Sequence, residues 1–171
     1  MAEYEFIVVA TGLDPEAEDF ADRFFAAGCD DATIAFQRGA IVLDFAREAK
    51  SFEQAVVSAM RDVRKAGATV ERVEPDSLVS LSDIAARSGL TKAAISLYAT
   101  GQRGAGFPPP VSRVTSESPL WDWVEVISWM ARFDKSDLPA DALSKARTIR
   151  KWNARLSAKR ETRPPTKQAA E

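Results

Sequence analysis

The amino-acid sequence lacks most of the side chains on which enzyme chemistry depends. It contains no histidine, which excludes Ser-His-Asp and Cys-His catalysis, histidine-ligated zinc and imidazole pH switching. Its single cysteine, Cys29, cannot form an internal disulfide. No acid–base pair stands out in the first half of the chain, so a small enzyme is the least favoured interpretation there. We therefore expect a protein without catalytic activity, resident metal or cofactor.

The charged side chains are distributed unevenly along the 171 residues. Residues 1–76 hold 8 Lys and Arg against 16 Asp and Glu, residues 77–138 hold 6 against 6, and residues 139–171 hold 9 against 3. An acidic beginning and a basic end indicate separate roles for the two. The N-terminus lacks the basic start of a signal peptide, and no window approaches about 20 apolar residues. We therefore expect a cytoplasmic protein without a membrane partner.

The first 75 residues alternate strand and helix patterns. Ser51 and Gln54 form a capping box for one helix, and Asp14 is the expected N-cap of another, which ends at Gly28. Apolar, β-rich runs predict strands at residues 4–10, 32–36, 40–45 and 68–73. The resulting order, β-α-β-β-α-β, resembles the ferredoxin-like split βαβ arrangement, a four-stranded sheet with both helices on one face. We interpret residues 1–75 as a dimerisation or packing domain in preference to a small-ligand domain.

Residues 80–104, SLSDIAARSGLTKAAISLYATGQRG, place small and apolar residues at helix-turn-helix spacing. Ser82 is the expected cap of the first helix, and Ala85 is small where the second helix crosses. Gly89 permits the left-handed backbone of a tight turn, and Thr91 caps the second helix. The side chains expected to be buried are Ile84, Ile95 and Tyr98. The outward side of the second helix is then Lys92, Ala93, Ser96 and Thr100, with Leu97 and Ala99 unassigned. A plain helical hairpin is the alternative.

A segment punctuated by glycine and proline follows and leads into an aromatic helix, residues 120–130, LWDWVEVISWM. A short hairpin followed by a helix that fills the core is the pattern of a wing. The tryptophans at 121, 123 and 129 could stack on unpaired bases, but their spacing in an amphipathic helix favours core packing.

Taken together, residues 80–132 resemble the winged helix-turn-helix of the excisionase and AlpA-like regulators, which are related to the DNA-binding domain of the MerR family. The resemblance rests on the helix-turn-helix pattern, on FPPPV at residues 107–111 and on the tryptophan-rich helix. It implies a winged helix-turn-helix domain over residues 80–135 that binds double-stranded DNA. The sequence departs from the pattern in two ways. Lys92 is the only charged residue of the second helix, and the wing is rich in Ser and Pro in place of Lys and Arg.

The resemblance also implies which residues contact DNA. The helix from Thr91 to Thr100 would enter the major groove, with Lys92 near its N-terminus. Arg103 and Arg113 would flank it on the wing. Arg87, on the first helix, is either a contact to the DNA backbone or a solvated surface charge. The full set of candidates is Arg87, Thr91, Lys92, Ala93, Ser96, Thr100, Arg103 and Arg113.

The spacing of apolar and basic residues over 136–160 predicts a basic amphipathic helix that begins near Asp137 and Pro139. Its apolar stripe is Leu143, Ala146, Ile149, Trp152 or Asn153, and Leu156, and its basic face is Lys145, Arg147, Arg150, Lys151, Arg155 and Lys159. We favour self-association through the stripe, with the basic face available to DNA. The alternative is a helix docked on its own domain. Residues 161–171 are predicted to be a disordered tail.

The predicted fold class is therefore α+β, with a ferredoxin-like domain, a winged helix-turn-helix and a C-terminal helix. The predicted function is a DNA-binding transcriptional regulator that acts as a homodimer on two related half-sites. One alternative is an architectural or excisionase-like DNA-bending protein of a mobile element, which needs few base contacts. Another is an adaptor that binds a protein and no DNA. A small-molecule ligand of the first domain has no support in the sequence.

Overall fold

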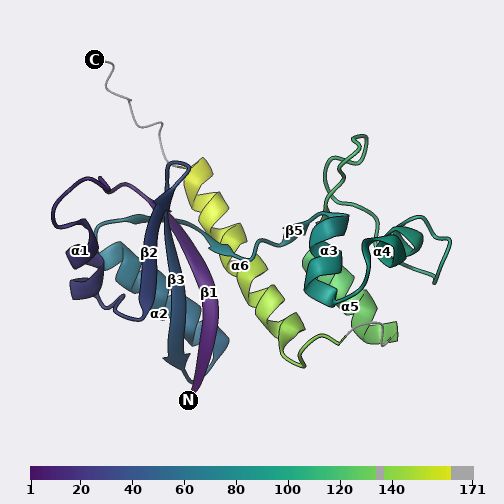
Figure 1. Cartoon of the computed structure of the whole chain (residues 1–171), viewed down its shortest axis with the longest axis horizontal. Helices are drawn as coiled ribbons and strands as arrows, with labels where there is room; N and C mark the ends of the chain where they lie inside the picture. The colour runs from purple at the N-terminus through teal and green to yellow at the C-terminus, as the bar shows by residue number, and fades with distance from the viewer. Residues whose placement is uncertain (134–136, 163–171) are drawn as a thin grey trace. The chain divides into compact units, whose positions relative to one another are not determined.

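The computed structural model describes residues 1–133 and 137–162. Within them the fold is mixed α+β, with six helices and a four-stranded antiparallel sheet (Figure 1). The chain divides into two compact units: unit 1 comprises residues 1–75 and 151–171, and unit 2 comprises residues 76–150. The C-terminal helix, predicted as a separate element, is instead divided between the two units.

Unit 1 is built on the sheet. Its elements are β1 (Ala2–Thr11), α1 (Phe20–Ala27), β2 (Ala32–Gln37), β3 (Ala40–Ala49), α2 (Phe52–Lys65), β4 (Thr69–Glu74) and the second part of α6 (Ala142–Glu161). The strand order is β2-β3-β1-β4, and every neighbouring pair is antiparallel. Both α1 and α2 lie on one face of the sheet (Figure 1). The predicted succession of strands and helices is therefore confirmed.

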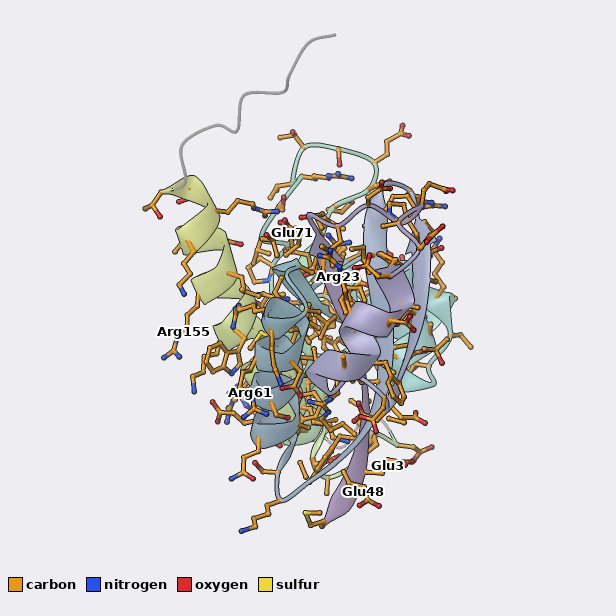
Figure 2. The ribbon with its side chains drawn as sticks, turned by 90° about the vertical axis from the view of Figure 1, so that its left-hand side faces the viewer. Glu3, Arg23, Glu48, Arg61, Glu71 and Arg155 are labelled. Atoms are coloured by element: carbon orange, nitrogen blue, oxygen red, sulfur yellow. The ribbon has the colours of Figure 1, made fainter. Side chains whose placement is uncertain are left out.

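The two faces of the sheet differ in chemistry because strand side chains alternate. Phe6 and Phe45 are cross-strand partners on the face covered by the helices, and their rings stack with centroids 5.5 Å apart. On the other face Glu3 pairs in register with Glu48, and both lie at the same end of the sheet (Figure 2). Glu3 and Glu48 are thus on the face of the sheet away from the aromatic core.

The first helix begins later than predicted. α1 starts at Phe20, whereas Asp14 was the expected N-cap. The Asp14 carboxylate accepts a hydrogen bond from the Glu16 amide, and its carbonyl accepts one from Ala17, so the residue closes a local turn instead. One half of the predicted capping box of α2 is confirmed, since the Ser51 hydroxyl accepts the Gln54 amide.

The second part of α6 covers the β4 edge of the sheet. The Asn153 side chain donates to the Val73 carbonyl and accepts the Val73 amide, both at 2.8 Å. Leu156 is buried, and Lys151 pairs with Glu53 at 2.6 Å. Three residues of the predicted apolar stripe, Ala146, Ile149 and Leu156, are buried within one chain, which favours the alternative of a docked helix over self-association through the stripe.

Unit 2 is mainly helical. Its elements are β5 (Leu78–Val79), α3 (Leu81–Ser88), α4 (Lys92–Ala99), β6 (Trp121–Asp122), α5 (Trp123–Phe133) and the first part of α6. Its buried core includes Ile84, Ile95 and Tyr98, as predicted, together with Trp121, Trp123, Trp129 and Ala146. The tryptophans therefore pack in the core, which was the favoured interpretation.

Two helix starts and the wing hairpin in unit 2 differ from the sequence expectation. The tryptophan-rich helix starts at Trp123, because the two preceding residues pair with β5 and the Asp122 carboxylate accepts the Val124 amide. The predicted wing hairpin is reduced to one isolated antiparallel bridge, between Ser112 and Leu120. The last helix starts at Ala142. The predicted tail lies outside the described residues from residue 163 onward, and α6 extends to Glu161.

Candidate nucleic-acid interface

α3 begins with a complete capping box. The Ser80 hydroxyl accepts the Asp83 amide at 3.2 Å, and the Asp83 carboxylate accepts the Ser80 amide at 2.8 Å. Hydrogen bonds from the Ser80 hydroxyl and amide lower the pKa of Asp83 below its usual value. Ser82, the predicted cap, lies inside the helix, because Asp83 stands three residues after Ser80 and not after Ser82.

The turn between α3 and α4 has the predicted chemistry. Gly89 has φ +72°, a left-handed conformation that L side chains rarely adopt. A Cβ at this position would meet nothing within 4 Å, so the requirement for glycine is conformational and not steric. The Thr91 hydroxyl accepts the Ala94 amide at 3.1 Å and caps α4. This hydroxyl therefore caps the helix as an acceptor, and that bond does not use its O–H, the group that would donate to a DNA phosphate in the predicted contact.

The outer face of α4 carries the other predicted contact residues of this helix. Lys92, Ala93 and Thr100 are exposed, and Ser96 is half-buried. The Thr100 hydroxyl donates to the Ser96 carbonyl at 2.9 Å. Leu97, which the sequence left unassigned, is 38% exposed. The outer face of α4 thus displays one ammonium group, one serine hydroxyl and several apolar groups.

An aromatic cluster anchors the loop that follows α4, residues 100–120. The Tyr98 and Trp129 ring centroids are 5.0 Å apart, and those of Phe107 and Trp129 are 5.1 Å apart. Gly104 lies against this cluster: a Cβ on it would be 3.2 Å from Tyr98 Cδ1. The beginning of the loop is therefore packed closely on the core formed by α4 and α5.

Two buried indoles also hold the loop by its backbone. Trp129 Nε1 donates to the Ala105 carbonyl at 2.9 Å, and Trp121 Nε1 donates to the Pro108 carbonyl at 3.1 Å. A buried indole N–H requires an acceptor, and a loop carbonyl without a ladder partner provides one. Sequence reasoning predicted that these rings are buried but missed their role as loop anchors.

The predicted arginines occupy different environments. Arg103 is exposed on the anchored part of the loop, and its guanidinium lies 5.4 Å from the Tyr98 ring centroid. Arg113 is exposed next to the Ser112 bridge, with φ +53°. Arg87 donates to the Asp76 carbonyl at 2.9 Å and lies over the Trp123 ring. Arg87 and Arg103 are thus both in contact with an aromatic ring of their own unit, and Arg103 and Arg113 are exposed on the loop.

Basic side chains outnumber acidic ones in this region, and the acidic residues Asp83 and Glu117 lie at its two ends. Residues 84–116 contain four basic side chains and no acidic one. Two acidic side chains of unit 2, Asp122 and Glu125, are paired with Arg150 of α6 at 3.2 and 3.3 Å. α4 and the loop after it therefore form a positively charged segment within a chain whose net charge is −2.

Three of the six residues on the basic face of α6 form ion pairs within the chain: Lys145, Arg150 and Lys151. Besides Arg150 and Lys151, Lys145 pairs with Asp141 at 2.8 Å and Arg160 with Glu71 at 3.1 Å. The Arg155 guanidinium lies 4.8 Å from the Trp152 ring centroid. These contacts are made within the chain, so α6 is a weaker candidate for DNA contact than the sequence indicated.

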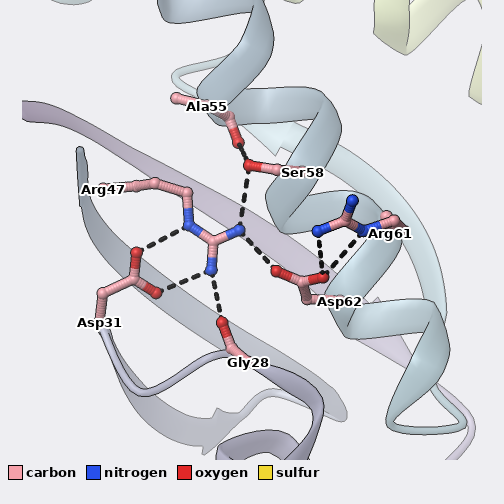
Figure 3. Close-up of polar contacts among 7 residues, drawn as sticks. All are labelled: Gly28, Asp31, Arg47, Ala55, Ser58, Arg61 and Asp62. Carbon is pink, nitrogen blue, oxygen red and sulfur yellow. Dashed lines mark hydrogen bonds and ion pairs between the residues drawn. The ribbon is translucent and has the colours of Figure 1, made fainter. Parts of the chain in front are cut away.

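Unit 1 contains a buried charged cluster that sequence reasoning missed (Figure 3). The Arg47 guanidinium donates to both carboxylate oxygens of Asp31 at 2.7 and 2.8 Å and to Asp62 at 2.8 Å. It also donates to the Gly28 carbonyl and the Ser58 hydroxyl. Burial lowers the pKa of Arg47, but the two carboxylates outweigh burial and raise it above its usual value.

This cluster holds unit 1 together and has the properties of a structural feature. It joins β3, α2 and the segment before β2, and every donor of Arg47 has an acceptor. Cys29 lies beside it, and burial raises the pKa of its thiol to about 11, which suppresses the reactive thiolate. Among the described residues, no group of histidine, cysteine and acidic side chains could hold a metal ion.

No protein family model, curated protein or solved structure matches the chain. No helix in the described part of the chain is both long enough and apolar enough to cross a membrane.

Proposed function

We propose that the protein is a DNA-binding transcriptional regulator that contacts the duplex with α4 and the 100–120 loop. The observation that carries this proposal is the acid-free segment 84–116, which presents Lys92, Arg103 and Arg113 on an exposed helix and an anchored loop. Such a segment on an acidic chain favours a polyanionic partner.

We further propose that the two units are a ferredoxin-like domain and a winged helix-turn-helix. The strand order β2-β3-β1-β4 with antiparallel neighbours supports the first. Two eight-residue helices joined across a left-handed glycine, then a loop tied to a third helix, support the second.

A fluorescence anisotropy titration of the full chain with a mixed-sequence duplex tests the proposal. Three to four phosphate contacts predict that affinity falls about 40- to 150-fold between about 50 and 200 mM salt. Lys92→Ala and Arg103→Ala should each reduce the salt slope by about one. Lys65→Ala, an exposed lysine of unit 1, removes the same charge and should change nothing. Binding without salt dependence, or equal effects of all three variants, would refute the docking surface.

A DNA-bending protein of a mobile element is the second candidate, and the single charge on α4 favours it, because bending requires few base contacts. Energy transfer between dyes at the two duplex ends separates the candidates, since only the bending protein shortens their distance. A protein-binding adaptor is supported if no duplex binds at all.

The predicted homodimer requires a different interface, because Ala146, Ile149 and Leu156 of the α6 stripe are buried within one chain. We propose the outer edge of β2. Residues 32–37, ATIAFQ, contain no charge and no proline, and β2 has one strand neighbour within the described sheet, β3. Natural proteins protect free edges with charges, so an unprotected edge favours pairing with a second copy.

Light scattering tests this interface with a matched pair of variants. Ala35→Lys places a charge on β2, and Ala46→Lys places one on β3; both positions are exposed on the same face of the sheet. Ala35→Lys should yield a monomer and Ala46→Lys should not. A monomeric parent protein at micromolar concentration would refute the dimer.

A further inference from the structure

The outer face of α4 has an apolar stripe where a DNA-reading helix usually carries charge. Ala93, Leu97 and Thr100 follow one another at spacings of four and three, so they lie on one side of the helix. Ala93 is exposed and Leu97 is 38% exposed. The Thr100 hydroxyl donates to the Ser96 carbonyl, so the contact groups that this residue can offer a partner are its γ-methyl and the acceptor lone pairs of its oxygen.

The stripe lacks the side chains that form paired hydrogen bonds with purines. Residues 91–100 contain no Arg, Asn or Gln, and Lys92 is the only basic residue among them. In the major groove thymine is the base that presents an apolar group, its C5-methyl, and alanine and the threonine methyl are suited to contact it. The chemistry of the stripe therefore matches one base better than the other three.

We infer that α4 recognises thymine C5-methyl groups in the major groove through Ala93, Leu97 and Thr100, with Leu97 as the specificity-determining residue. This inference rests on the proposed function and adds the class of site: duplexes with A·T pairs beneath α4. Lys92, Arg103 and Arg113 then supply affinity through phosphates, and the stripe supplies discrimination.

The experiment separates the two roles by removing single methyl groups from DNA. Duplexes are selected from a random library with the full chain, and each thymine of the selected site is replaced in turn by uracil, which lacks only the C5-methyl. At one or more positions we expect affinity to fall about 4-fold, as for the loss of one buried methyl-sized group. Leu97→Ala should bring the thymine-to-uracil affinity ratio close to one there, with an unchanged salt slope.

Lys92→Ala is the matched control on the same helix, since it should reduce the salt slope by about one and preserve the thymine-to-uracil ratio. Leu97→Asn, which keeps the side-chain length and branching, should lose the ratio as Leu97→Ala does. Salt-dependent DNA binding with no effect of uracil at any position would overturn the inference and leave the proposed function standing. Failure to bind any duplex would overturn both.

Discussion

Replacing Arg47 with alanine should destabilise unit 1 strongly. The Arg47 side chain is 8% exposed and its partner Asp62 is 10% exposed, so the variant leaves a buried carboxylate without its main partner. Breaking a buried pair in this way costs about 3 to 5 kcal/mol. Asp31 is 29% exposed and regains water, and Arg61 remains 3.0 Å from Asp62. We therefore expect the lower end, about 3 kcal/mol.

Arg61→Ala is the control for this prediction. Arg61 also pairs with Asp62, but its side chain is 74% exposed on the outer side of α2 (Figure 2). Exposed pairs contribute about 0 to 1 kcal/mol, so the free energy of unfolding should hardly change.

Urea unfolding followed by circular dichroism, together with thermal melting, measures both variants. A loss of about 3 kcal/mol corresponds to a Tm decrease of roughly 12 °C or more for a unit of this size. The double variant Arg47→Met, Asp62→Leu should be more stable than Arg47→Ala, because apolar groups can replace a buried pair. If Arg47→Ala and Arg61→Ala unfold at the same urea concentration, the reasoning about the buried cluster is wrong.

Three further predictions concern unit 2. Ser80→Ala should cost about 1 kcal/mol of unfolding free energy and Ser82→Ala less than about 0.5, measured by urea unfolding, because only Ser80 caps α3. The pKa of Asp83 is lowered in the folded protein, so the stabilisation from the capping box is fully present above the ordinary Asp pKa of 3.8 and is lost as pH falls through the folded pKa. The loss of unfolding free energy caused by Ser80→Ala should therefore become smaller when urea unfolding is measured at progressively lower pH. A loss that stays constant with pH would contradict the assignment. Trp129→Phe should leave unit 2 folded but loosen the loop at Ala105, seen as faster amide hydrogen exchange at residues 101–107, whereas Trp123→Ala should cost roughly 3 to 5 kcal/mol.

The elements that the sequence predicts well are those determined by local interactions. Ser51, Gly89 and Thr91 act within three or four residues, so their types and spacing indicate the caps and the turn before any packing is known. The predicted start of α1 was wrong because Asp14 can either cap a helix or close a turn, and its carboxylate is the hydrogen-bond acceptor in both structures.

Contacts between distant segments could not be predicted in this way. Nothing in the local sequence connects Asn153 with the backbone of Val73, so a docked helix was the less favoured alternative and β4 as its docking site was not predicted. The same is true of Arg47 and its two carboxylates. The outward face of α4 was largely predicted by helical periodicity, but the exposure of Leu97 depends on which neighbours pack beside it.

The most direct test of the account is the salt dependence of duplex binding by the parent protein, Lys92→Ala, Arg103→Ala and the control Lys65→Ala. The account predicts a slope of about −2.7 to −3.6 in log affinity against log salt for the parent. It also predicts a slope closer to zero by about one for each of the first two variants and no change for the third. A parent protein that fails to bind duplex at about 50 mM salt, or variants that all retain the parent slope, would contradict the account.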